Sequence, residues 1–269
     1  MRSFAIVFKL IGYKVKSLTY YPISFIIGFV SQWLSYGSGI LVIFAIMKNF
    51  TILNGWRTYE ILFLCGFTLM SYAIGASFAC PAATTLPKLI AHGEIDSVLT
   101  KPVYSLAYII ASEYSISYLA HFTISFIIIC ISAFKLKLYF SFLNSIWFAV
   151  SLLGSALIQA SFILLTSFYS FRSVGTSPFS TLYWNTRDFL NFPMSLFLKN
   201  NVFLQIFFTA VIPYTFVSFF PCQYFLNKND LFFFPPVIKY GTPLVGIVLT
   251  FMTVFIWNLI IKRYTSSGT

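Results

Sequence analysis

Acidic residues and histidines are scarce in this chain, which has six Asp and Glu residues and two histidines among its 269 residues. Metal sites and Ser-His-Asp sites need several such side chains close together. His92 and His121 lie in different segments, and neither belongs to an H-E-x-x-H motif or stands with a G-x-S-x-G motif. The motif G-x-x-x-x-G-K-[ST], which binds ATP phosphates, is absent as well. We therefore expect no catalytic residue, no metal and no cofactor on this chain.

Charge of either sign is also rare. Charged residues make up 9% of the chain, against roughly 25% in soluble domains, while hydrophobic residues make up 59%. A soluble core of this length is excluded. The formal net charge is +11, but the basic residues stand singly or in pairs at the ends of apolar runs, where lipid headgroups account for them. We expect the lipid bilayer as a partner, and no nucleic acid.

Six apolar runs are each long enough to cross a bilayer, which takes about 20 residues in a helix. We place the spans at about 22–47, 60–81, 104–133, 142–169, 202–225 and 241–261. No segment between them is long enough to fold as a soluble domain. The sequence therefore predicts an all-α, polytopic membrane protein in which residues 1–269 form one domain with six transmembrane helices.

The first 19 residues have apolar side chains at helical spacing, with Lys9 and Lys16 on the other side. This pattern is typical of a helix that lies in the membrane interface before the chain turns inward at Pro22. The alternative is that residues 1–19 extend the first span.

The distribution of Lys and Arg predicts the orientation. With the N-terminus inside, eleven basic residues are cytoplasmic, including Arg172, Arg187 and Lys199, and six lie outside. We expect a multi-pass protein of the plasma membrane with both termini in the cytoplasm.

Residues 86–103 connect the second and third spans. Leu86, Leu89 and Ile90 fall on one helical face, and Gly93 can end a short helix. A short amphipathic cytoplasmic helix between two spans is a natural docking element for a soluble partner. The alternative is a solvated linker.

The run Gly93, Ile95-Asp96, Leu99 and Lys101-Pro102-Val103 resembles the G-x-[IL]-D-x-x-L-x-[KR]-P pattern of type-two ATP-binding-cassette (ABC) transporter permeases. Two further patches are similar to the same family. One is Phe192-Pro193 with Ile212-Pro213-Tyr214 and Phe220-Pro221, and the other is Trp257 to Tyr264 with Ser266, Ser267 and Gly268. The patches follow one another in order from residue 93 to the C-terminus.

This resemblance implies a permease subunit of an ABC exporter. Two such subunits, identical or sister chains, would form the pathway, and separate cytoplasmic ATPase subunits would bind ATP and Mg and drive alternating access. The ATPase-coupling loop would consist of Leu86, Leu89, Ile90, Gly93, Ile95, Asp96, Leu99, Lys101 and Pro102. Asp96, Lys101 and Pro102 would fix its turn. The low number of charges inside the spans favours an apolar or amphiphilic cargo.

Glu113 and His121 are the ionisable residues of the third predicted span. An ionisable group at membrane depth marks either a transport pathway or a packing contact, and both interpretations stay open for each residue. A standalone secondary carrier or channel would also show six spans, although such carriers usually need carboxylates at the midplane and inverted repeats. Glu113 is the sole acidic candidate, and no such repeat is seen. A structural subunit without transport activity is a third interpretation.

Overall fold

The computed structural model describes residues 2–17, 20, 22–49, 52–173, 177–230 and 232–265. Within these ranges the secondary structure is helical apart from one isolated bridge between Leu53 and Trp56. Five of the described helices are long and apolar enough to cross a membrane, or six segments if one bent pair is counted as a span. The five are α2 (Pro22–Asn49), α3 (Thr58–Ala91), α6 (Leu119–Lys135), α7 (Phe142–Ser167) and α12 (Thr242–Arg263). The predicted all-α, polytopic membrane fold is confirmed.

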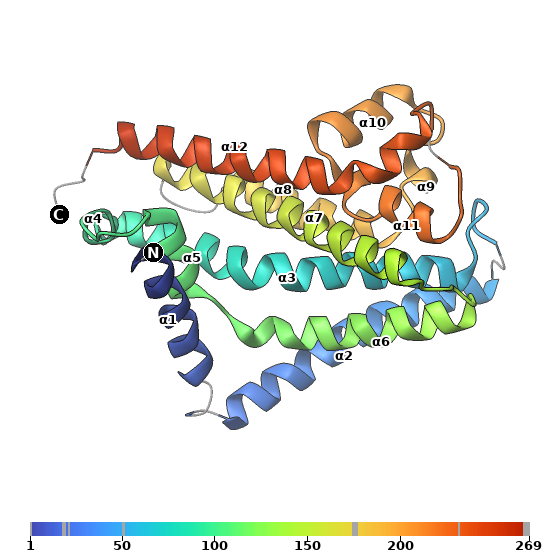
Figure 1. Ribbon diagram of the computed structural model, residues 1–269, viewed down its shortest axis with the longest axis horizontal. Coiled ribbons are helices and arrows are strands. Elements are labelled where there is room, and N and C mark those ends of the chain that lie inside the picture. Colours follow the sequence, from blue (N-terminus) through green and yellow to red (C-terminus); the bar gives the residue numbers. More distant parts are fainter. Residues whose placement is uncertain are drawn as a thin grey trace.

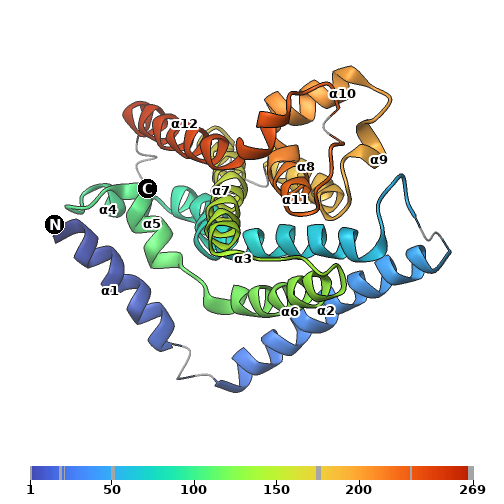
Figure 2. The ribbon, with the colours of Figure 1, turned by 45° about the vertical axis from the view of Figure 1, so that its right-hand side comes forward.

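The long helices give the bundle two ends (Figure 1). The terminal end holds α1 (Arg2–Ser17), α4 (Ile95–Leu99), α5 (Ser105–Glu113) and the last turn of α12. The opposite end, which we call the hairpin end, holds residues 202–225. α1 packs on α5 and lies at a steep angle to α2 (Figure 2). The amphipathic N-terminal segment is thus a separate helix and not an extension of the first span.

α3 lies at the centre of the bundle and packs against both α7 and α6. It approaches α7 closely because small residues line the contact: a Cβ at Gly75 would overlap the backbone carbonyl oxygen of Ala156. One turn away, Gln159 Nε2 donates to Ser71 Oγ at 2.6 Å. Small residues and interhelical hydrogen bonds are the usual basis of helix packing in membranes. Ser71 and Gly75 of α3 thus serve helix packing within one chain.

α3 is longer than the predicted second span. It continues to Ala91, so Leu86, Leu89 and Ile90 belong to its last turns and do not form a separate helix. The helix ends where predicted: His92 is the C-cap, and Gly93 follows with a φ of +68°, a left-handed conformation that glycine adopts without strain. The separate short helix of this region is α4.

The third predicted span, 104–133, is broken. α5 ends at Glu113, and α6 begins only at Leu119, after the short 3-10 turn Ile116–Tyr118. The break is stabilised by α3, in which Pro81 has no N–H to offer to the carbonyl of Ser77. That carbonyl accepts the backbone N–H of Ser115 at 3.1 Å. The carbonyl that Pro81 leaves free in α3 therefore accepts an N–H that the break between α5 and α6 leaves free. Backbone groups at membrane depth need such partners, because no water is there to bind them.

The fifth predicted span, 202–225, is not a straight helix. α10 (Val202–Ile206) continues as a π-helical turn to Val211, and the following segment Tyr214–Phe225, which contains α11 (Phe219–Phe225), is bent by 70° against it. Pro213 lies in the bend, where its ring prevents the helix from continuing. Figure 1 places both arms at the hairpin end.

Residues 177–198 follow the length of the bundle instead. They form α8 (Pro178–Thr186), the 3-10 helix Arg187–Asn191 and α9 (Ser195–Leu198). The carbonyl of Leu190 accepts a hydrogen bond from Thr68 in α3 at 2.9 Å, and the hydroxyl of Ser195 accepts one from Trp56 just before α3 at 3.2 Å. Ser177 lies at the opposite, terminal end beside Lys88 and His92. The segment that sequence analysis placed in a cytoplasmic loop thus runs alongside α3 from one end to the other.

Candidate functional site

The predicted coupling loop forms one compact turn at the terminal end. Leu86 and Ile95 are buried, while Leu89, Ile90, Asp96, Leu99 and Lys101 are half-buried and Pro102 is exposed. Three side-chain hydrogen bonds anchor the turn and the start of α5. Lys101 Nζ donates to the Tyr108 hydroxyl at 2.6 Å within this region. The other two reach α12, from Trp257 Nε1 to Ser105 Oγ at 3.1 Å and from the Tyr104 hydroxyl to Asn258 Oδ1 at 3.0 Å.

Asp96 lies in the first turn of α4, where Glu94 is the N-cap and makes no side-chain cap. Its carboxylate faces the hydroxyl of Tyr264, directly after α12. Partial burial and the carboxylate of Asp96 raise the pKa of that phenol. Asp96 therefore lies where the coupling turn approaches the end of the last span.

Two cavities of about 680 Å³ and 620 Å³ adjoin along α3, because both are lined by Cys80, Thr84 and Trp184. The smaller cavity reaches Lys88 and His92 at the terminal end. The larger one reaches side chains at the middle of the bundle. We refer to the pair as the α3 groove. It connects the coupling turn with the centre of the protein.

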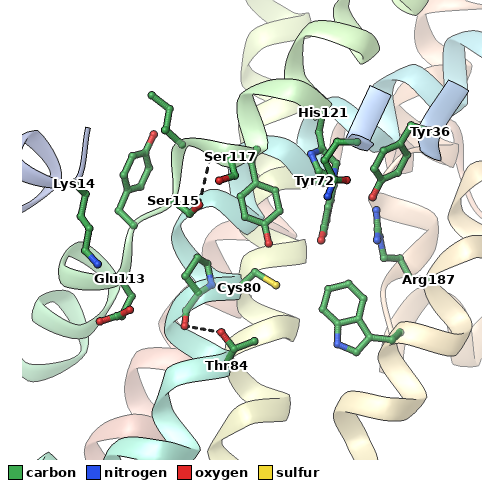
Figure 3. Close-up of a pocket in the computed structure, with 16 residues that line it drawn as sticks. Lys14, Tyr36, Tyr72, Cys80, Thr84, Glu113, Ser115, Ser117, His121 and Arg187 are labelled. Atoms are coloured by element: carbon green, nitrogen blue, oxygen red, sulfur yellow. Dashed lines mark hydrogen bonds between the residues drawn. The ribbon is translucent and has the colours of Figure 1, made fainter. Parts of the chain in front are cut away.

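A cluster of aromatic side chains surrounds Arg187 at the inner end of this groove (Figure 3). The Arg187 cluster consists of Arg187, Tyr36, Tyr72, Tyr118, His121 and Trp184, contributed by α2, α3, α6, α8 and their flanking turns. The guanidinium carbon lies 3.6 Å from the ring centroid of Tyr72 and 5.7 Å from that of Trp184. The hydroxyl of Tyr36 points toward the guanidinium. Arg187 thus lies beside the middle of α3.

His121 belongs to this cluster. Its ring packs edge-on against Tyr36, with centroids 4.5 Å apart, and contacts Tyr118 and Tyr72 at 5.2 and 5.7 Å. The side chain is 5% exposed, and its Nδ1 atom is buried without a hydrogen-bond partner.

Glu113 has different surroundings, at the end of α5 and the outer rim of the larger cavity. Thr85 Oγ1 donates to its carboxylate at 3.2 Å, and the ammonium group of Lys14 in α1 points toward it (Figure 3). The carboxylate thus lies where α1, α3 and α5 meet. Nowhere in the described part of the chain do three His, Cys, Asp or Glu side chains gather closely enough to hold a metal ion.

Arg187 was not predicted as a site residue, because the sequence pattern assigned it to a cytoplasmic loop. A signal was present: Arg187 and Asp188 are the only charged residues between Arg172 and Lys199. That interval is long enough to cross a bilayer. Prolines and polar residues make it a weaker transmembrane pattern than residues 200–227.

Comparison with known proteins gives a match to one protein family, described as ABC-2 family transporter protein, over residues 33–268. No curated protein and no solved structure matches the chain in the corresponding searches. The matched range contains α3, the coupling turn, the Arg187 cluster and α12. Members of this family are non-catalytic membrane subunits of transporters. The chain therefore belongs to the ABC-2 family of transporter membrane proteins, as its coupling-loop pattern predicted.

Proposed function

We propose that this chain is the permease subunit of an ABC exporter. Cytoplasmic ATPase subunits would bind the terminal end, and a second permease, identical or a sister chain, would complete the pathway. ATP and Mg would be held by the ATPase subunits. The observation that supports this proposal most is the anchoring of the coupling turn: Lys101 bonds the turn to α5, and the start of α5, which follows the turn directly, is bonded to α12.

The same geometry supports alternating access as the mechanism. Residues 86–91 are the last turns of α3, and α3 also lines the groove. A helix of 34 residues is about 51 Å long at ~1.5 Å per residue. A rigid displacement of the turn by an ATPase subunit would therefore move the groove wall directly. α5 would follow because Lys101 of the turn is bonded to it, and α12 would follow because it is bonded to the start of α5.

The surface of the bundle fits a bilayer. Exposed large apolar side chains cover α2 and α12, among them Ile26, Leu34 and Leu41 on the first and Leu244, Phe251 and Phe255 on the second. In water such a surface would favour aggregation. We propose a plasma-membrane location with the terminal end in the cytoplasm, because that end must meet the ATPase.

The experiment compares wild type with Asp96→Ala and Asp96→Lys, each affinity-tagged and purified in detergent from cells that produce the cognate ATPase subunit. We expect all three to insert normally and both variants to retain less ATPase, or to retain it without substrate-stimulated ATP hydrolysis. Asp96→Lys should be the more severe, because it reverses the charge that faces Tyr264.

Glu94→Ala is the matched control. Glu94 is an exposed acidic residue of the same turn whose side chain makes no capping bond, so its variant should behave like wild type. If both Asp96 variants assemble and transport normally, the turn is a linker. If the purified chain alone is fully active in liposomes, it is a standalone carrier and not an ABC permease.

A further inference from the structure

The charge of Arg187 is not neutralised by any carboxylate of the described residues. Arginine stays protonated in proteins. Glu60 pairs with Lys228 at 2.9 Å near the hairpin end, and Glu113 lies at the terminal rim of the groove. Among the described residues, Arg187 makes no ion pair and no hydrogen bond to a carbonyl oxygen. A cation beside the centre of a membrane bundle is costly unless a partner compensates it.

The aromatic cluster compensates this charge only in part. Rings above the guanidinium plane interact with its faces, whereas its five N–H groups lie in the plane and point outward from its edge. The Tyr36 hydroxyl meets the guanidinium from one direction. The edge of the guanidinium otherwise has the fork geometry that suits a planar or tetrahedral anion.

A buried polar atom beside Arg187 lacks a hydrogen-bond partner. The buried Nδ1 of His121 makes no hydrogen bond, although the His121 ring lies within contact distance of three tyrosines of the cluster. The cavity that both residues line has a volume of about 680 Å³, which is typical of a small-molecule site. Its wall combines aromatic rings with apolar residues such as Pro81 and Ile116.

We propose that the α3 groove binds an amphiphilic anion, an aromatic or apolar body with a carboxylate, sulfonate or phosphate group, and that Arg187 recognises the anionic group. The apolar body would stack on the tyrosine and tryptophan rings. The identity of the bound anion as the transported cargo rests on the proposed function. The ligand could be a soluble compound or an anionic lipid, since both present the same chemistry.

The test uses three probes with one aromatic body: 1-naphthylacetate, its neutral amide, and the cationic 2-(1-naphthyl)ethylamine. Binding is measured by calorimetry to the full chain in phosphatidylcholine nanodiscs. We expect wild type to prefer the anion over the amide by about tenfold or more, as charge-assisted hydrogen bonds do. Arg187→Gln should abolish the preference. Arg187→Lys should reduce it, because lysine keeps the charge and loses the fork.

Arg172→Gln is the matched control, since Arg172 is an exposed arginine outside the groove, and it should keep the wild-type preference. Tyr36→Phe should weaken anion binding moderately and provides a second variant if Arg187→Gln does not fold. If added phosphatidylglycerol competes with 1-naphthylacetate, the natural anion is a lipid. If it does not compete, the natural anion is a soluble compound. Both results agree with the proposal.

A wild-type protein without preference for the anion would overturn the inference, as would an Arg187→Gln variant that keeps the preference. ATPase co-purification separates this inference from the proposed function. Arg187→Gln should retain the ATPase, because the coupling turn is untouched. Anion preference in a chain that never co-purifies with an ATPase would leave the anion site standing and reject the permease assignment.

Discussion

Glu113 shows how local packing decides the role of an ionisable residue. Its carboxylate accepts a hydrogen bond from Thr85 and faces the ammonium group of Lys14, so it joins three helices at the terminal end. We predict that Glu113→Gln leaves transport and ATPase association within a few-fold of wild type, because the amide keeps the shape and can still accept from Thr85. The stability cost should be about 0–1 kcal/mol, the usual range for a partly exposed charge interaction.

The measurement is substrate-stimulated ATP hydrolysis and thermal unfolding of the purified complex. Thr85→Val is the companion variant, since it removes the donor and keeps the charge. Loss of transport in Glu113→Gln, with normal expression and normal ATPase association, would place Glu113 in the pathway.

His121 was singled out from the sequence as an ionisable residue of a predicted span, whereas Arg187 was not. An ionisable residue in an apolar run can be recognised from the sequence, and His121 was. The three tyrosines around it come from α2, α3 and the turn before α6, so their convergence depends on tertiary contacts. Arg187 is stacked on a ring 115 positions earlier in the chain. No local pattern contains that information.

The contact between α3 and α7 is the element on which the bundle depends most directly. We predict that Gly75→Ala destabilises the protein, because the new Cβ would overlap the backbone oxygen of Ala156 and the helices would have to separate. Overpacking of this kind costs about 1–3 kcal/mol. Gly28→Ala is the matched control: Gly28 lies inside α2, and a Cβ there meets nothing within 4 Å.

Both substitutions gain the same helix propensity, about 1 kcal/mol, so the difference between their melting temperatures in detergent isolates the packing cost. Gly75→Ala should melt at a lower temperature than wild type, and Gly28→Ala at an equal or higher one. Equal melting temperatures for the two variants would mean that α3 and α7 do not meet at Gly75.

Element positions were predictable where a long apolar run coincides with one straight helix, as for α2, α7 and α12. The break between α5 and α6 and the bend at Pro213 were not predictable. The length of an apolar run indicates that a segment is buried in the membrane, but not that its helix is straight. Ser115 is satisfied by a carbonyl of α3. In the hairpin, Ser218 Oγ donates to the carbonyl of Leu190 at 3.3 Å. Broken helices persist at membrane depth when such distant partners exist, and these partners are known only from the fold.

The whole molecule places the coupling turn and the Arg187 cluster at two points of one helix, α3. It also revises the distribution of basic residues. Because Lys199 lies at the hairpin end and Arg187 between the ends, the terminal end holds nine Lys and Arg residues and the hairpin end seven. The bias of eleven to six expected from the sequence is therefore smaller. Orientation needs a direct test.

We predict that residues 177–198 cross the membrane and that residues 202–225 stay on the outer side. Single cysteines at Asn54, Ser97 and Asn200, all exposed, are introduced into a variant without the four native cysteines. A membrane-impermeant maleimide applied to intact cells should label the cysteines at positions 54 and 200, and the one at 97 only after permeabilisation. Asn54 donates to the carbonyl of Ser195 at 3.3 Å, which is why the first and third positions should share one side. If the cysteine at position 200 is labelled only after permeabilisation, like the one at 97, residues 177–198 form the cytoplasmic loop expected from the sequence. If the cysteine at position 97 is labelled in intact cells, the orientation is the inverse of the one predicted.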